Sequence, residues 1–453
     1  MKKITASLVA VALFAGDAAS VAAAQDYAKY SQEALEKELA RIAVSRPGVM
    51  VRMRDGVALS TDVYMPKQAK GKLPTILWKT PYNEHKLKGG TMRYVLESVK
   101  RGYTFIVQNE RGRYFSQGQW EILGKPQTDG YDTLSWIAAQ DWSNGKVGTL
   151  GCSSSAEWQL ALAGLNHPAH AAMVPMASGA GIGKVGRFQE QGNWYTGGVP
   201  RNLFFVWLYG VDNPLRAELP ASLTDEKLRA RVEAYNDLDA SKPKVDWNRQ
   251  IRHLPVDQLL SSLGEPAGTF EQLIKRSPAD PAWRQGGLYH EGMGWGVPAL
   301  WFNSWYDVSI GPNLELFNHA RAAGTDKEAS ANQYAVVAPV PHCQFARLGP
   351  DTTVGERAMA TPASTSTAPS TAGSTAGSRA MPRPSRPPPR TCATSRWAPT
   401  SGAAAPSGRR SRPSRCASTC ARAAAPIPCT ATAACCPRPR PPARHPTATA
   451  TTR

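Results

Sequence analysis

Between residues 49 and 176, short apolar runs alternate with segments of helical periodicity, and this alternation constrains the fold more than any other feature. Strands that alternate with helices are typical of βα units on one mostly parallel sheet. The expected strands cover residues 75–79, 103–108, 147–152 and 172–176, after a hairpin that turns at Asp55-Gly56. The expected helices cover residues 91–101, 129–139 and 154–165. Later strands at 299–303 and 334–338, with a helix near 314–323 between them, extend the same α/β fold.

Residues 182–296 break this βα rhythm. They are rich in Trp, Arg and Leu at helical spacing, for example in 255–263 and 270–274. An insertion at this place in the chain would lie over the carboxyl ends of the strands, where open α/β sheets bind ligands. We therefore expect a helical cap that walls a substrate pocket. The alternative is a second independent domain, since about 110 residues are enough to fold alone.

Residues 358–453 differ in composition from the rest of the chain. They contain no Leu, Val, Phe, Tyr, Asp or Glu, but 14 Arg and six of the eight Cys. The first 357 residues therefore carry only +4 of the net charge of +18. A segment with so little to bury is expected to be a disordered tail.

Three interpretations of this tail compete: a natural linker, an Arg-rich nucleic-acid arm, and the product of a shifted reading frame. We favour the frameshift, because almost all the residue types in the tail have codons with C or G in the middle position. No nucleic-acid partner is then expected. Translating the other frames of the coding DNA tests the idea, which fails if none of them shows a hydrophobic strand pattern.

The N-terminus has the order of a secretory signal peptide. Met1-Lys2-Lys3 is followed by an apolar run from residue 4 to 15 and by small residues up to Ala24, where we expect cleavage. The run is too short for a stable membrane anchor. Residues 1–24 therefore predict a secreted or periplasmic protein, with a buried N-terminal helix as the alternative.

The segment Gly151-Cys152-Ser153-Ser154-Ser155-Ala156 joins an expected strand to an expected helix. A sharp turn of small residues at this junction is the shape of the nucleophile elbow of α/β-hydrolases, in which a serine hydroxyl is exposed at a helix N-terminus. There the free N–H groups can stabilise an oxyanion. The match to G-x-S-x-G is incomplete because Ser155 stands at the last Gly position, and a Ser-rich helix cap is the alternative. The register favours Ser153 as the nucleophile over Cys152, Ser154 and Ser155.

Two later strand ends supply an acid and a base in the chain order of this fold. Asp307 follows one expected strand, and His342, preceded by two prolines in Pro339-Val340-Pro341, follows the next. In a triad the His accepts the serine proton and the Asp fixes the His tautomer. Singly, each residue is more simply explained as a polar loop residue; together and in order, they favour a triad.

The sequence offers little for a metal or cofactor. HExxH, CxxC, GxGxxG and GxxxxGK[ST] do not occur, so no metal, dinucleotide or nucleotide cofactor is expected. Cys152 and Cys343, the two cysteines before the tail, suggest neither a disulfide framework nor a metal-ligand spacing.

Several further motifs occur in order along residues 45–357. They are Met53-Arg54-Asp55-Gly56-Val57, Thr61-Asp62-Val63-Tyr64, Thr80-Pro81-Tyr82, Gln108-Asn109-Glu110-Arg111-Gly112-Arg113, Asp129-Gly130-Tyr131-Asp132-Thr133, Trp142-Ser143-Asn144-Gly145-Lys146-Val147-Gly148 and Trp305-Tyr306-Asp307. In this combination the chain resembles the CocE/NonD hydrolases, a family that includes cocaine esterase, α-amino acid ester hydrolases and Xaa-Pro dipeptidyl-peptidases. The resemblance implies an α/β-hydrolase core in two parts, residues 45–181 and 297–357, around a cap at 182–296.

The resemblance also implies roles for individual residues. Ser153 would be the nucleophile, Asp307 the acid and His342 the base, with the Tyr82 hydroxyl and the Ser154 backbone N–H donating to the oxyanion. The chain departs from the family where Ser154 replaces a Tyr and Ala156 replaces a Gly. It departs further at the C-terminus, where the tail stands in place of a β-rich jelly-roll domain, which we expect to be missing.

The sequence thus predicts a serine hydrolase that needs no cofactor. Its substrate would be a small ester, an amide or a short peptide, and the sequence makes no prediction of oligomeric state. The alternative is a truncated, catalytically inactive hydrolase fold with a binding role only.

Overall fold

The computed structural model describes residues 29–84, 87–189, 194–196, 199–212, 226–235, 242–277, 279–345 and 352–359. They belong to one compact unit, Met1–Pro369. The expected signal peptide at 1–24 lies outside the described residues. So does the expected tail, apart from Ala358 and Met359, which end the described chain; Ala358 lies in the short strand β14 (Arg357–Ala358), paired with β13 (Thr353–Val354).

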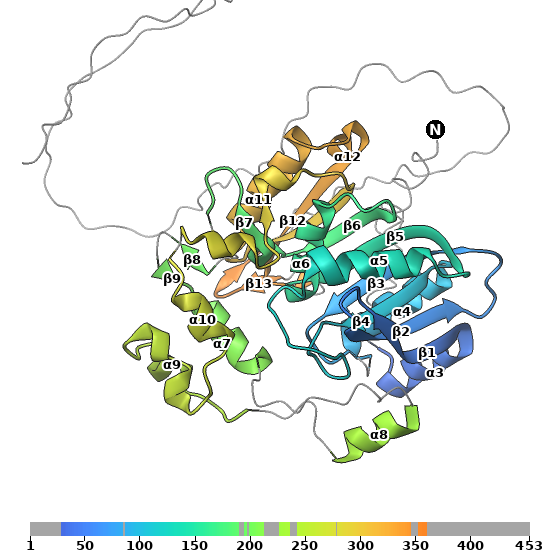
Figure 1. Cartoon of the computed structure of the whole chain (residues 1–453), viewed down its shortest axis with the longest axis horizontal. Helices are drawn as coiled ribbons and strands as arrows, with labels where there is room; N and C mark the ends of the chain where they lie inside the picture. The colour runs from blue at the N-terminus through green and yellow to red at the C-terminus, as the bar shows by residue number, and fades with distance from the viewer. Residues whose placement is uncertain are drawn as a thin grey trace, which may run out of the picture. The chain divides into compact units, whose positions relative to one another are not determined.

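An eight-stranded sheet in the order β1-β2-β4-β3-β5-β6-β11-β12 forms the centre of the unit (Figure 1). The strands β1 (Ala43–Arg52) and β2 (Ala58–Pro66) form the predicted hairpin and are antiparallel to their neighbours. The six strands β3 (Leu73–Thr80), β4 (Thr104–Asn109), β5 (Ser143–Cys152), β6 (His170–Met176), β11 (Ala299–Tyr306) and β12 (Gln333–Pro341) pair in parallel. Each of the six overlaps one of the strands that the apolar runs predict.

Successive side chains of each buried strand point to opposite faces of the sheet. Both faces therefore carry apolar side chains, and helices cover both of them. Ile76 and Trp78 of β3 pack with α3 (Gln32–Ile42) and α4 (Gly89–Lys100) on one face. Leu77, between them, packs on the other face with α5 (Tyr131–Ala138) and α6 (Ser154–Ala163). The helix α11 (Ile310–Ala322) joins α6 in a third cluster against β6 and β11.

This three-layer arrangement confirms the predicted α/β-hydrolase fold. The helix α3 was not predicted from the sequence. A sequence signal for its start was present, because Ser31 caps the helix by accepting a hydrogen bond from the Ala34 N–H. The expected helix at 129–139 is also divided in the structure, since a five-residue π-helical turn, η1 (Pro126–Gly130), precedes α5.

The described part of 182–296 combines short helices with very short strands. The helices are α7 (Asn202–Val211), α8 (Glu226–Tyr235), α9 (Trp247–Gln250) and α10 (Thr269–Ile274). Strand β7 (Ile182–Lys184) pairs in parallel with β10 (Tyr289–His290), and β8 (Tyr195–Thr196) pairs with β9 (Val199–Pro200). An aromatic cluster that includes Trp194, Phe204 and Phe270 holds α7 and α10 together.

The helical interpretation of residues 255–263 is wrong. Two 3₁₀ turns, η3 (Val256–Gln258) and η4 (Ser261–Leu263), occupy this stretch. Their tighter winding still places Leu259 and Leu260 in the aromatic cluster, so apolar spacing does not distinguish them from a helix. Across the described residues, no helix is both long and apolar enough to span a membrane.

Candidate active site

Ser153 lies in a sharp turn between β5 and α6. Its backbone has φ 58° and ψ −134°, a region that non-glycine residues rarely occupy. The Ser153 N–H donates to the Met176 carbonyl of the adjacent strand at 2.9 Å, and its own carbonyl accepts from Ala156 and Glu157 at the start of α6. The turn needs a glycine two residues earlier, because a Cβ on Gly151 would lie 1.9 Å from the Ser155 carbonyl oxygen.

Ser155, at the position where the motif has its last glycine, is accommodated without a clash. Its side chain is buried and donates to the Thr80 hydroxyl at 2.8 Å. Ser154 opens α6, and a first helical residue has no acceptor for its N–H within the helix.

Asp307 and His342 meet because β11 and β12 are paired in parallel. The register places Tyr306 opposite Pro341, so the next residue of each strand leaves the sheet at the same edge. His342 Nδ1 is 2.6 Å from Asp307 Oδ2. The other carboxylate oxygen, Oδ1, accepts from the Ser309 N–H at 3.1 Å and from its hydroxyl at 3.0 Å. Only 1% of the Asp307 side chain is exposed, compared with 36% for His342, so the acid is buried behind an accessible imidazole.

A cavity of about 380 Å³ brings these residues together. Tyr82, Ser153, Ser154, Asp307 and His342, all five site residues expected from the sequence, line it. Most of the remaining wall is apolar, from Trp78, Val308 and three α7 residues, Leu203, Phe204 and Trp207. The segment expected to form a cap therefore contributes directly to the wall of the cavity.

The Tyr82 side chain is oriented by a residue that sequence reasoning missed. Trp207 Nε1 donates to the Tyr82 hydroxyl oxygen at 3.0 Å, which leaves the hydroxyl proton free to point elsewhere. Burial raises the pKa of Tyr82 to about 12, although hydrogen bonds with Trp207 and Ser153 act in the opposite direction. The hydroxyl is therefore a neutral donor at physiological pH, next to the Ser153 side chain. No sequence signal singles out Trp207, since α7 is apolar along most of its length.

Two carboxyl groups besides Asp307 line the cavity, and neither was expected from the sequence. Glu157 is buried on the first turn of α6. Burial, and then the charges of Glu110 and Asp307, raise its pKa well above the ordinary value. Burial also raises the pKa of Glu84. No Lys or Arg is among the described residues that line the cavity.

A disulfide bond joins Cys152 to Cys343, across 191 residues of sequence. The interpretation of these two cysteines as isolated is therefore wrong. A sequence signal for the pair was present: each cysteine is adjacent to a residue expected in the same site, Cys152 to Ser153 and Cys343 to His342. Within the described residues, no group of three or more His, Cys, Asp or Glu side chains could hold a metal ion.

Residues 55–344 match the X-Pro dipeptidyl-peptidase (S15 family). The chain belongs to this family. Within it, the chain is 29% identical over 273 residues to a cocaine esterase from Rhodococcus sp. (strain MB1 Bresler), covering 59% of this chain and 45% of the esterase. It is also 29% identical over 148 residues to a putative serine esterase from Mycobacterium bovis, covering 28% of this chain and 24% of that protein. The chain thus spans less than half the length of the curated relatives it matches.

Among solved structures, the S15 chain is similar to an α-amino acid ester hydrolase, with 23% identity and a TM-score of 0.48. That match covers 67% of this chain and 48% of the other. A CocE/NonD family hydrolase from Staphylococcus aureus matches with 19% identity and a TM-score of 0.41, covering 66% of this chain and 47% of that one.

Proposed function

We propose that this S15 chain is a serine hydrolase that cleaves a small ester or amide through an acyl-enzyme on Ser153. The observation that carries the proposal is the 2.6 Å contact between His342 Nδ1 and Asp307 Oδ2 at the same cavity as the strained Ser153 turn. A Ser-rich helix cap in an ordinary βα turn would not require a buried carboxylate–imidazole pair beside it. Membership of the S15 family supports hydrolase chemistry in general.

In the proposed mechanism, the Ser153 hydroxyl oxygen attacks the substrate carbonyl while His342 Nε2 accepts the hydroxyl proton. Asp307 holds the imidazole in the tautomer with the proton on Nδ1 and stabilises the imidazolium that forms. When the tetrahedral intermediate collapses, His342 returns the proton to the leaving alcohol or amine. A water molecule then attacks the acyl group by the same steps and frees Ser153.

The negative charge of the tetrahedral intermediate needs donors that already point at it. We assign this role to the Tyr82 hydroxyl and the Ser154 backbone N–H. Trp207 occupies an acceptor position of the Tyr82 oxygen, and burial keeps the phenol protonated. Ser154 stands at the N-terminus of α6, where the helix dipole adds to the stabilisation of negative charge.

The cavity supports a small substrate with an uncharged acyl group. Its volume of about 380 Å³ lies at the small end of ligand pockets. The apolar wall from α7 and Trp78 would pack against an aliphatic or aromatic acyl chain. An anionic acyl group would lose its hydration against this wall, and no Lys or Arg among the described lining residues could pair with it.

The test combines a fluorophosphonate probe with turnover of a p-nitrophenyl ester. We expect wild-type protein to be labelled and to release p-nitrophenol, and Ser153→Ala to do neither. His342→Ala should lose at least about 10⁴-fold in kcat, since removal of the histidine of a triad can cost about 10⁶-fold. Ser135→Ala, on the exposed surface of α5, is the matched serine control and should behave as wild type.

Normal labelling of Ser153→Ala would refute the nucleophile assignment. Turnover that survives in His342→Ala would refute the base. Wild-type protein that binds esters without turnover would support the alternative of an inactive, binding-only hydrolase fold.

A further inference from the structure

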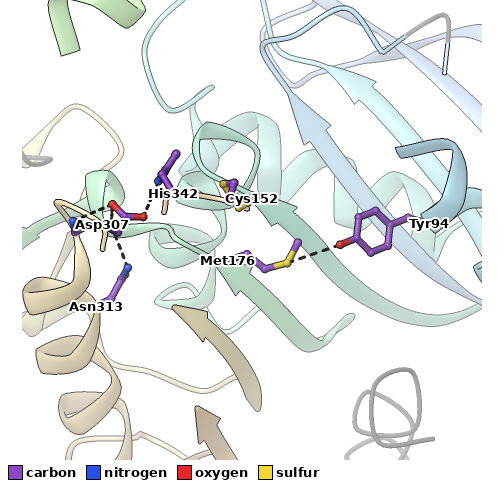
Figure 2. The surroundings of a disulfide bond; sticks show 8 residues. Tyr94, Cys152, Met176, Asp307, Asn313 and His342 are labelled. Atoms are coloured by element: carbon purple, nitrogen blue, oxygen red, sulfur yellow. Dashed lines mark hydrogen bonds and ion pairs between the residues drawn. A yellow bond between two sulfur atoms is a disulfide. The ribbon is translucent and has the colours of Figure 1, made fainter. Parts of the chain in front are cut away.

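The Cys152–Cys343 disulfide connects the two halves of the proposed active site. Cys152 is the last residue of β5 and directly precedes Ser153, whereas Cys343 directly follows His342. Both cysteines line the cavity. Figure 2 shows the disulfide beside His342, with Asp307 on the other side of the imidazole.

The sheet by itself does not hold these two segments together. Strands β6 and β11 lie between β5 and β12, and three strand spacings amount to about 14 Å. The Cα atoms of Cys152 and Cys343 are nevertheless only 6.1 Å apart. The chain after β12 must therefore turn back across the ends of β11 and β6. The disulfide is the covalent bond that holds this segment next to the end of β5.

The backbone at the turn also needs to be held. Cys343 has φ 57°, in the left-handed region that a residue with a Cβ rarely adopts. Such a conformation persists where the surroundings over-determine it. On the other side of the bond, Ser153 has φ 58°. The disulfide thus links two strained positions: Ser153, the proposed proton donor, follows Cys152, and Cys343 itself follows His342, the proposed acceptor.

We propose that the Cys152–Cys343 disulfide is a positioning element that holds His342 against the Ser153 turn, so that its reduction by a dithiol slows acylation of Ser153. The inference rests on the proposed roles of Ser153 and His342. One thiolate of the dithiol attacks one cysteine sulfur and expels the other cysteine as a thiolate. The second thiolate of the dithiol then attacks the mixed disulfide and expels the first cysteine. Two electrons pass to the protein, leaving two cysteine thiols and an oxidised, cyclic dithiol.

The disulfide would form in a compartment where thiols are normally oxidised. Disulfides persist in secreted and periplasmic proteins, and residues 1–24 predict export to such a compartment. In a reducing compartment the same chain would be made with Cys152 and Cys343 as free thiols. The bond would then make full activity conditional on export.

The experiment uses the full chain before and after treatment with dithiothreitol. Alkylation and peptide mapping read Cys152 and Cys343 separately from the six cysteines after residue 358. We expect reduction of the pair to lower kcat by about 10- to 100-fold with little change in KM, since a misplacement of about 1 Å can cost 10²-fold. The rate of fluorophosphonate labelling should fall by the same factor, and reoxidation should restore both.

The double variant Cys152→Ala/Cys343→Ala is the matched control. It should have the kcat of the reduced protein and no response to dithiothreitol, so a response that remained would come from the other six cysteines. Its circular dichroism must show a folded chain at the assay temperature. If it does not fold, reduction of the folded wild-type protein provides the same comparison.

A second readout does not depend on turnover. The Nδ1 proton that His342 shares with Asp307 should give a far-downfield proton resonance that is missing from His342→Ala. We expect reduction to broaden or abolish it. If reduction abolishes this resonance but the oxidised protein neither turns over nor labels, the proposed function fails while the disulfide still positions His342.

Three results would overturn the inference. One is unchanged kcat, labelling and resonance after mapping shows both cysteines reduced. Another is a fully active wild-type protein whose Cys152 and Cys343 are free thiols. The third is a double variant that loses thermal stability but keeps wild-type kcat, which would make the bond a stabiliser of the fold only.

Discussion

The contribution of the Tyr82 hydroxyl to turnover can be worked out from its surroundings. The Tyr82→Phe substitution removes one donor to the proposed oxyanion and leaves the buried ring in place. Loss of one such donor typically costs 10²–10³-fold in kcat, or about 2.7–4 kcal/mol of transition-state stabilisation. KM should change little, because the hydrogen bond strengthens only when charge develops on the substrate oxygen.

The same substitution has a separate effect on stability. It deprives Trp207 Nε1 of its acceptor at 3.0 Å, in a partly buried place. A buried donor without a partner costs about 1–3 kcal/mol, and partial access to water favours the lower end of that range. Trp207→Phe removes this donor and keeps the tyrosine hydroxyl. Both variants should unfold at lower urea concentrations than wild type, Tyr82→Phe because a donor is orphaned and Trp207→Phe because a smaller ring packs less well against the aromatic cluster. They should differ widely in kcat, with Trp207→Phe losing less than about tenfold.

Steady-state hydrolysis of p-nitrophenyl acetate, with the burst phase measured by stopped flow, separates acylation from deacylation. Both steps pass through an oxyanion, so Tyr82→Phe should slow both. Because burial holds the Tyr82 pKa at about 12, the ratio of wild-type to variant kcat should be constant from about pH 6 to 9. A kcat within threefold of wild type, or equal to that of Trp207→Phe, would refute the assignment. A ratio that varied strongly with pH would instead indicate that Tyr82 acts as a base.

Three further outcomes are expected. Asp307→Asn keeps the shape of the buried acid but disturbs the His342 tautomer, so kcat should fall by roughly 10⁴-fold while near-wild-type stability is retained; a loss below tenfold would exclude the triad. A p-nitrophenyl ester with a terminal carboxylate on its acyl chain should react at least about tenfold more slowly than its neutral isostere, because no cationic lining residue among those described replaces the hydration of the carboxylate; equal rates for the two esters would contradict this argument. Burial lowers the pKa of His170 to about 3, so its contribution to stability is present above pH 6.5 and is lost as the unfolded chain gains a proton at lower pH. Between pH 6.5 and 5 this amounts to about 2 kcal/mol, which urea titrations should find in wild type and not in His170→Gln.

The sequence was most informative where one physical cause dominates the local structure. Apolar runs such as residues 75–79 form buried strands, because only a sheet covered on both faces accommodates continuous apolar side chains. The Ser153 turn was recognisable because Gly151 leaves no room for a Cβ. Asp307 and His342 were expected together from their order in the chain and their place just past two strands, and these strands do end side by side in the sheet.

The features of the site that the sequence did not predict depend on contacts between segments far apart in the chain. Glu157 reads as an ordinary acid in the first turn of a helix, and only the fold turns it toward the cavity beside Asp307. Trp207 is one aromatic residue among several on α7, and nothing in its neighbours indicates which ring reaches Tyr82. The Cys152–Cys343 bond requires the chain after β12 to cross two strand ends, a path that no local pattern describes.

The register that pairs Tyr306 with Pro341 limits how this site can change over evolutionary time. Side chains along β11 and β12 can be substituted as long as they fill the same space. The backbone register, and not the identity of these side chains, places the residues that follow the two strands next to each other. A one-residue insertion or deletion in either strand would send Asp307 or His342 to the opposite face of the sheet. Substitutions in β11 and β12 can therefore adapt the site to new substrates, whereas a change in the length of either strand would disrupt the site. Length variation should accumulate instead in the segment between β6 and β11, which contributes to the cavity wall without positioning Asp307 or His342.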